Sequence, residues 1–178
     1  MTSFWLEIGF GAGEHLSALC RRNPQTGYIG AEPFINGVAA LLKDVQADEM
    51  PIENLRILHG DAMKLALSFT PASLDGIYVL NPDPWPKKRH HNRRIIRPDT
   101  LDVFARILKS GGALIMSTDV DDLAEWMVTH ASNHPAFTWT ARTKADWQIM
   151  PEGWIPTRYE QKGITAGRKQ TYLIFTRK

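Results

Sequence analysis

The chain has 178 residues, of which 43% are hydrophobic, 22% charged and 10% aromatic. These values predict a single folded domain over residues 1–178 with a sizeable core, and they exclude a largely disordered chain. One cysteine excludes an internal disulfide framework and is typical of a reducing compartment, so we expect a cytoplasmic protein. No apolar run reaches the roughly 20 residues that cross a membrane, so we expect no membrane partner.

The formal net charge of +2 conceals a local concentration of positive charge. Six cations lie between residues 87 and 97, so the remainder of the chain is net negative. Because the basicity is confined to one segment, it predicts one surface that binds a polyanion such as a nucleic acid.

Short apolar strands alternate with amphipathic helices along the chain. The alternation predicts an α/β fold, with a mostly parallel sheet covered by helices on both faces. Gly111 and Gly112 are expected to stop the helix before them. Taken by itself, the segment around Arg158 and Lys162 predicts a surface strand. In chain order we expect a strand at 4–8, a helix at 14–22, a strand at 28–32, a helix at 37–45, strands at 55–59 and 74–80, a helix at 100–108, a strand at 113–117, a helix at 123–130, and late strands at 138–147 and 172–176.

Acidic residues recur where the expected strands end. Ligands of parallel α/β sheets bind beyond the carboxyl ends of the strands, so acids at these positions predict a ligand site at that edge. The five acids are Glu7, Glu32, Asp61, Asp83 and Asp119.

A glycine-rich turn follows the first expected strand. Gly9, Gly11 and Gly13 have the spacing G-x-G-x-G, which differs from the dinucleotide pattern G-x-G-x-x-G. Glu7 and Glu14 flank the turn and would repel a pyrophosphate. S-adenosylmethionine has no phosphate and carries an ammonium group, so we expect this cofactor, with S-adenosylhomocysteine as its product. The alternative is that the two acids only solvate a loop and cap a helix.

Two further acids suit the same cofactor. Glu32, at the end of the second expected strand, has the position from which an acid binds a ribose diol in dinucleotide folds. Asp61 can accept a hydrogen bond from an adenine amino group.

The segment 81–94 joins a proline-rich acidic turn to a run of cations. Its three prolines fix φ and bias the residues before them towards extended geometry, so we expect a rigid loop that presents Asp83 and Trp85. A carboxylate beside an indole suits a nitrogen-rich ring, and the cations suit a phosphate backbone. Trp85 either stacks on that ring or supports the turn. His90 and His91 have no acid or cysteine at ligand spacing, so we expect no metal.

Five motifs, in the same order, resemble those of bacterial tRNA (guanine-N7)-methyltransferases. The resemblance covers essentially the whole chain. It implies a class I S-adenosylmethionine-dependent methyltransferase fold, with a Rossmann-like, mostly parallel sheet and a late antiparallel strand. It also implies methyl transfer to N7 of guanine at position 46 in the tRNA variable loop. The motifs are LEIGFGAGEH (6–15), GAEPFINGV (30–38), GDA (60–62), NPDPWPKKRH (81–90) and TRYEQKG (157–163).

The resemblance also implies a site of three parts, with Asp83 as the catalytic residue at the reacting centre. The residues implied to hold the cofactor are Glu7, Gly9, Gly11, Gly13, Glu32, Asp61, Ala62, Asn81 and Asp83. Those implied to contact the target nucleoside are Lys87, Asp119, Thr157, Arg158, Tyr159 and Glu160. Those implied to bind RNA are Lys88, Arg89, His90, His91, Asn92, Arg93 and Arg94.

Two alternatives remain open. The turn at 81–85 also resembles the Asn-Pro-Pro-aromatic turn of amino-group methyltransferases that act on a nucleobase or a protein glutamine, although Asp83 and the cations speak against this. The sequence lacks the N-terminal extension usual in the tRNA-modifying family, which motivates a catalytically weak RNA-binding subunit. We expect tRNA as the partner, and a monomer or homodimer.

Overall fold

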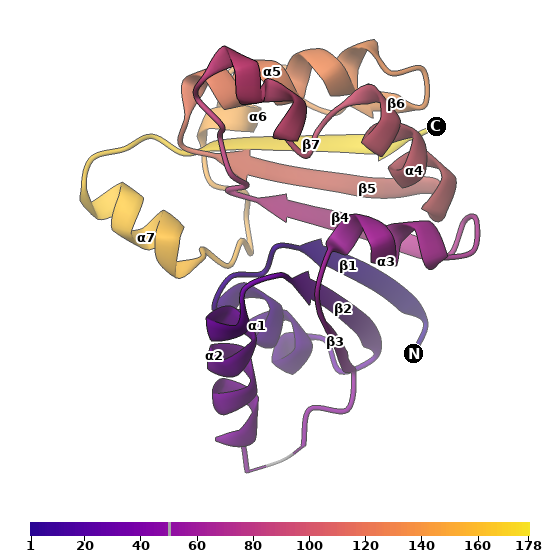
Figure 1. Ribbon diagram of the computed structural model, residues 1–178, viewed down its shortest axis with the longest axis vertical. Coiled ribbons are helices and arrows are strands. Elements are labelled where there is room, and N and C mark those ends of the chain that lie inside the picture. Colours follow the sequence, from indigo (N-terminus) through magenta and orange to yellow (C-terminus); the bar gives the residue numbers. More distant parts are fainter. Residues whose placement is uncertain (50) are drawn as a thin grey trace.

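Seven strands pair into one mixed sheet in the computed structural model, which describes residues 1–49 and 51–178 (Figure 1). Their order across the sheet is β3-β2-β1-β4-β5-β7-β6. The pairs β1–β2, β2–β3, β1–β4 and β4–β5 are parallel, whereas β7 is antiparallel to both β5 and β6. The strands are β1 (Ser3–Ile8), β2 (Thr26–Glu32), β3 (Leu55–His59), β4 (Leu74–Leu80), β5 (Leu108–Thr118), β6 (Phe137–Trp139) and β7 (Thr171–Arg177).

The winding of the sheet reverses between β1 and β4. From β1 the chain moves outward to β2 and β3, then returns across the sheet to β4 and continues the other way. Such a reversal opens a crevice beyond the carboxyl ends of the two adjacent strands, where open α/β sheets bind ligands. The five strand-end acids lie at or just past the ends of β1 to β5, as the sequence predicts.

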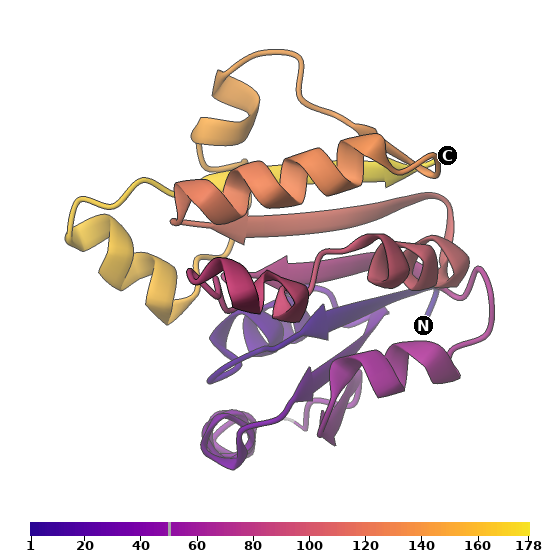
Figure 2. The ribbon, with the colours of Figure 1, turned by 45° about the horizontal axis from the view of Figure 1, so that its top comes forward.

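Helices cover both faces of the sheet, as expected. The first two helices contact each other on one face, while α3, α4 and α5 pack in a row on the other (Figure 2). α7 lies beyond the carboxyl ends of β4 and β5 in both views. No helix in the described part of the chain is long and apolar enough to cross a membrane. The helices are α1 (Glu14–Arg22), α2 (Ile35–Gln46), α3 (Ala62–Ser68), the 3-10 helix η1 (Lys88–Arg93), α4 (Pro98–Ile107), α5 (Asp121–Asn133), α6 (Ala145–Gln148) and α7 (Arg158–Thr165).

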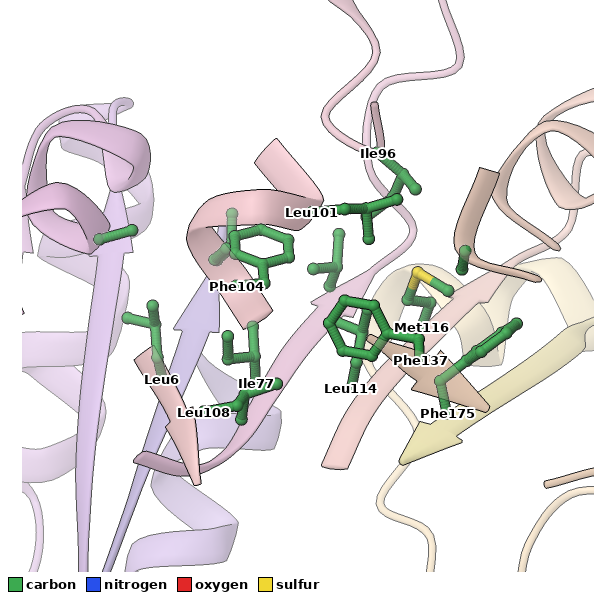
Figure 3. Close-up of a cluster of buried hydrophobic side chains, with 14 of the residues drawn as sticks. Leu6, Ile77, Ile96, Leu101, Phe104, Leu108, Leu114, Met116, Phe137 and Phe175 are labelled. Carbon is green, nitrogen blue, oxygen red and sulfur yellow. The ribbon is translucent and has the colours of Figure 1, made fainter. Parts of the chain in front are cut away.

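The main core lies between the central strands and α4 (Figure 3). Leu101 and Phe104 project from α4 towards the sheet, where they meet Ile77 of β4 and Leu114 of β5. All four side chains are fully buried. The three-residue spacing within α4 places its apolar residues on one face, which is why this helix can pack on the sheet.

Three expectations about local structure are wrong. The strand expected at 138–147 ends at Trp139, because the Asp146 carboxylate accepts from the backbone N–H groups of Arg142 and Thr143, both at 2.8 Å, and turns the chain into α6. The segment around Arg158 is helical rather than extended. Gly111 and Gly112 do not stop α4, which ends at Ile107, but lie inside β5.

The helix α3 lies in a segment for which neither a helix nor a strand was expected. Asp61 begins it by accepting a hydrogen bond from the backbone N–H of Met63 at 2.8 Å. The helix has only seven residues, and in so short a run the spacing of apolar residues does not distinguish a helix from a loop.

Removing the Phe104 ring should destabilise the fold. Phe104→Ala leaves a cavity in the core, so we expect the free energy of unfolding to fall by about 3–5 kcal/mol in urea denaturation. The matched control is Leu67→Ala on α3, where the side chain is 62% exposed and the change should stay within about 0.5 kcal/mol. Equal effects of the two changes would contradict this core.

Candidate active site

A cavity of about 870 Å³ lies at the crevice between the carboxyl ends of β1 and β4. Its volume falls within the range of roughly 300–1,000 Å³ that is usual for small-molecule sites. The wall comes from the glycine turn, the start of α2, the start of α3 and the turn after β4. The lining residues lie within 8–12, 32–37, 61–62 and 81–85, together with Arg93 and Ile95.

The glycine turn, residues 9–13, lines the cavity with backbone atoms that no side chain covers. Gly9 and Gly11 have φ values of 68° and 57°, in the left-handed region that favours glycine. A Cβ on either residue would meet no atom within 4 Å, so the backbone there faces open space. Gly13 does not line the cavity but begins α1, where a Cβ would lie 2.7 Å from the Leu41 side chain.

Glu32 holds the glycine turn against the start of α2. Its side chain is buried, and its two oxygens accept from the backbone N–H groups of Gly11 and Phe34, each at 2.9 Å. Gly37 allows this close approach, because a Cβ there would lie 2.2 Å from the Gly11 carbonyl oxygen. The Glu32 carboxylate thus lines the cavity in a fixed orientation.

Glu7 is at the end of β1 but does not line the cavity. Its carboxylate is buried and lies 2.7 Å from Nδ1 of His15, which is also buried. The Tyr78 ring packs edge-on against His15, with ring centres 4.8 Å apart. The pair of Glu7 and His15 therefore connects β1 to the first turn of α1.

The turn at 81–86 is strained in a way that the sequence does not predict. Asn81 and Trp85 precede prolines, yet their φ values are 46° and 44°, so the expectation of extended geometry at these two residues is wrong. Asn81 is held on two sides: its backbone N–H donates to the Ser117 carbonyl at 2.8 Å, and its Oδ1 accepts from Nε2 of Gln170 at 2.7 Å. Backbone strain that is fixed from outside is a common feature of functional sites.

Asp83 and Trp85 both line the cavity. Asp83 is exposed, and its carboxylate has no hydrogen-bond partner among the residues that the structure describes. The Arg93 guanidinium lies over the Trp85 ring at 4.9 Å, and His90 meets the same ring edge-on at 5.9 Å. Trp85 therefore lines the cavity and also packs against the cationic segment, residues 87–94.

Arg94 is buried, which contradicts the expectation that it binds RNA. Only 1% of its surface is exposed, because its guanidinium lies over the Trp126 ring, at 5.0 Å, and forms an ion pair with Asp122. Its Nε donates to the Pro84 carbonyl at 2.9 Å. The hydrogen bond from Arg94 lowers the pKa of Asp122. Arg94 thus attaches the strained turn to the start of α5.

The other residues of the cationic segment remain accessible. His90 and His91 are half-buried, and His91 packs edge-on against Trp126, with ring centres 5.3 Å apart. The exposed residues are Lys87, Lys88, Arg89, Asn92 and Arg93.

A second cluster lies around the first turn of α7, outside the cavity. Thr157 begins the helix by accepting from the Glu160 backbone N–H at 3.1 Å. The Glu160 carboxylate is buried and accepts from Nε1 of Trp154 at 3.0 Å and from the Tyr172 hydroxyl at 2.6 Å. Burial, and then this hydrogen bond, raise the pKa of Tyr172. Glu160 therefore anchors α7 and does not present its carboxylate to solvent.

Asp119 joins this cluster from the end of β5. Its carboxylate accepts from the Tyr159 hydroxyl at 3.3 Å and from Nε of Arg168 at 2.5 Å. Burial and the Asp119 charge raise the pKa of Tyr159. The structure thus brings together Asp119 and the expected residues 157–160, while Lys87 lies exposed on the loop before η1.

Unpaired polar atoms concentrate near the strained turn. Within the described residues, buried side-chain atoms without a hydrogen-bond partner include Nδ2 of Asn81, Nη1 of Arg94 and Oγ of Ser117. An unpaired buried donor costs about 1–3 kcal/mol, so native structures hold few of them. Asn81 and Ser117 lie at the ends of β4 and β5, next to the cavity, where a bound ligand or water could supply partners.

Several residues of the site carry no sequence signal. Gln170 and Arg168 lie 89 and 49 positions from their partners Asn81 and Asp119, so no local pattern could connect them. Phe34 lines the cavity with 70% of its surface exposed. A large apolar residue directly after Glu32-Pro33, at the start of a helix, is the sequence signal that marks it as a cavity residue.

Comparisons with known sequences give consistent matches. A family model described as "Putative methyltransferase" matches residues 2–173. A tRNA (guanine-N(7)-)-methyltransferase of Azorhizobium caulinodans is 48% identical over 172 residues, which cover 97% of this chain and 74% of the relative. The enzyme of the same name from Rhodospirillum rubrum is 45% identical over 174 residues, covering 98% of this chain and 68% of that protein.

Solved structures agree with the fold alone, because their sequences are distant. An rRNA methylase from Streptococcus thermophilus superposes with a TM-score of 0.65 at 11% identity, covering 98% of this chain and 86% of the other. TrmN from Thermus thermophilus gives a TM-score of 0.66 at 15% identity, covering 99% of this chain and 44% of the other.

The adjacent residues Arg93 and Arg94 should differ sharply in their effect on stability. Arg94→Ala removes the contact with Trp126 and the hydrogen bond to Pro84, so we expect the free energy of unfolding to fall by about 2–4 kcal/mol. Arg93→Ala, at an exposed position, removes only the contact with the Trp85 ring and should change it by no more than about 1 kcal/mol. Urea denaturation of the two variants measures the difference, and similar values would refute the buried role of Arg94.

Proposed function

The chain belongs to the tRNA (guanine-N(7)-)-methyltransferase family, and from this membership we propose that it transfers a methyl group from S-adenosylmethionine to N7 of a guanine in tRNA. We further propose that the target is guanine 46 of the variable loop and that the protein acts in the cytoplasm. The observation that carries the proposal is the match to relatives of this name at 45–48% identity over almost the whole chain.

The cavity fits a cofactor with a ribose and no phosphate. Each oxygen of Glu32 accepts one backbone hydrogen bond and keeps a lone pair for a ribose hydroxyl. The same carboxylate, close to the glycine turn, would repel a pyrophosphate there. The residues proposed to hold the cofactor from the cavity wall are Gly9, Gly11, Glu32, Asp61, Ala62, Asn81 and Asp83. We propose that Glu7 and Gly13 act indirectly, since they support the glycine turn without lining the cavity.

The reaction requires alignment of the two reactants more than it requires proton transfer. N7 of guanine carries a lone pair and no proton, so the protein needs no general base at that atom. When bound, S-adenosylmethionine supplies an electrophilic methyl group on a sulfonium that leaves as a neutral thioether. Holding the two reactants in line contributes by removing translational and rotational freedom.

Asp83 is proposed to stabilise the charge that develops during transfer. Methylation at N7 makes the purine cationic, and a carboxylate next to the ring lowers the energy of that charge. The Asp83 carboxylate is free to accept from guanine N1–H and the exocyclic amine, because it lines the cavity and has no partner among the described side chains. The strained turn, fixed by Gln170 and Arg94, keeps this residue in place.

The remaining expected residues are proposed to bind the RNA around the cavity. Phosphates would contact the exposed cations of the segment 87–93, which lies next to Trp85. Lys87, Asp119 and residues 157–159 would meet the target nucleoside outside the cofactor, and the buried Glu160 would act indirectly by holding this segment in place. A variable-loop base reaches such a cavity only when it is flipped out of its stack.

Transfer of a labelled methyl group to unmodified tRNA tests the proposal directly. After the reaction, borohydride reduction and aniline treatment cut the RNA chain at N7-methylguanosine. We expect label incorporation and a cut at position 46. Label without a cut would instead support an amino-group methyltransferase, although Oδ1 of Asn81, the atom that would bind an amine, already accepts from Gln170.

Asp83→Asn should reduce turnover far more than cofactor binding. Loss of the negative charge removes transition-state stabilisation, so we expect kcat to fall by about 10²–10³ while the affinity for S-adenosylmethionine stays nearly constant. Asp121→Asn, at an exposed acid near the same edge, is the control and should keep wild-type kcat. Unchanged turnover of Asp83→Asn would defeat the assignment.

Gly37→Ala should weaken the binding of S-adenosylmethionine. The new Cβ would overlap the Gly11 carbonyl and displace the glycine turn. We expect an affinity loss of about tenfold by calorimetry, since overpacking costs roughly 1–3 kcal/mol. Gly60→Ala is the matched control, because its Cβ would meet nothing closer than 3.7 Å. If both variants bind alike, Gly37 does not shape the site.

A further inference from the structure

The outer face of α7 carries a polar and basic stripe. Arg158, Gln161, Lys162 and Thr165 follow the spacing i, i+3, i+4, i+7, which places them on one side of the helix. All four are exposed and, with Ala166, line a shallow groove of about 440 Å³. We call these four residues the α7 stripe.

The α7 stripe is uncovered because polar contacts on the opposite side attach the helix. The buried residues of α7 are Glu160 and Gly163. Glu160 bonds to Trp154 and Tyr172, while Gly163 packs against the ion pair of Arg168 with Asp119. The helix is not held by apolar side chains packed on the sheet, so the stripe remains accessible to another molecule.

The charge of Arg158 is placed unfavourably for an isolated helix. Arg158 lies in the first turn, where the helix dipole is positive and favours acids. Lys162, in the last turn, suits the dipole, but it lies four residues from Arg158, and like charges at this spacing repel. Within the described part of the chain neither side chain forms a salt bridge or a hydrogen bond. A bound anion would relieve both repulsions.

The segment that leads into α7 and the segment 87–93 pack on opposite faces of the sheet. The loop before α7 packs on the α1 face, where the Trp154 ring lies 6.1 Å from the His15 ring. The other segment packs on the α5 face through Arg94 with Asp122 and His91 with Trp126. α7 itself lies beyond the carboxyl ends of the central strands (Figure 1). Both α7 and the segment 87–93 thus lie at the edge of the sheet that holds the cavity.

We propose that the α7 stripe is a second contact surface for the RNA backbone, across the cavity from the segment 87–93. The proposal rests on the proposed function. Arg158 and Lys162 would bind phosphates, and the Gln161 amide would donate to phosphate or 2′-hydroxyl oxygens. The Thr165 hydroxyl already donates to the Gln161 carbonyl at 2.9 Å, so it would accept from a 2′-hydroxyl. The RNA would be held on both sides of the nucleotide that enters the cavity.

Salt titration of tRNA binding tests the proposal on the intact chain. The affinity K for a nucleic acid falls as salt rises, and each phosphate contact adds about 0.7–0.9 to the steepness of log K against log salt. We therefore expect the double variant Arg158→Gln/Lys162→Gln to bind unmodified tRNA more weakly, with a slope smaller by about 1.4–1.8. The charge-retaining variant Arg158→Lys/Lys162→Arg should keep the wild-type slope. Thermal unfolding followed by circular dichroism verifies that the variants are folded.

Lys43→Gln/Lys178→Gln is the matched control. It also removes two exposed cations, one in the last turn of α2 and one after the end of β7, and should leave the slope unchanged. A wild-type slope in Arg158→Gln/Lys162→Gln, with methyl transfer by the wild-type protein intact, would overturn the α7 proposal alone. Failure of the wild-type protein to bind or methylate tRNA would overturn the proposed function and this inference together.

Discussion

The parallel pairing of β1 with β4 is the constraint from which the site follows. Each strand has its other parallel neighbour on the opposite side, so the helical connections leave the pair in opposite directions. A crevice remains where they part, and the glycine turn and the turn after β4 face each other across it. Burial of Leu6 and Ile77 holds the two strands together, so the same apolar side chains that stabilise the sheet also define the cavity.

The turn after β4 depends on side chains from distant parts of the chain. Gln170, directly before β7, holds Asn81, and Arg94 holds Pro84 against α5. Without these contacts a turn with two positive φ values would relax. The free carboxylate of Asp83 is therefore positioned by the completed sheet and not by the prolines alone.

The basic residues near the cavity serve two different purposes. Arg94 is buried and structural, whereas its neighbour Arg93 lies over Trp85 at the cavity wall. On the other side, Arg168 pairs with Asp119, while Arg158 and Lys162 face solvent. In each case a cation that supports the local structure lies close to cations that are free to bind phosphate.

The sequence by itself determined the alternation of strands and helices, the parallel sheet and the acids at the strand ends. These features follow from local periodicity and short-range turn chemistry, which a linear pattern records. It also placed Glu32, Asp83 and the glycine turn at one edge. Only the tertiary structure decided that Arg94 and Glu160 are buried and that Glu7 turns towards His15. It also decided that Asn81 meets Gln170. Burial and long-range hydrogen bonds depend on which segments the folded sheet brings together, and residue type and spacing alone do not encode that.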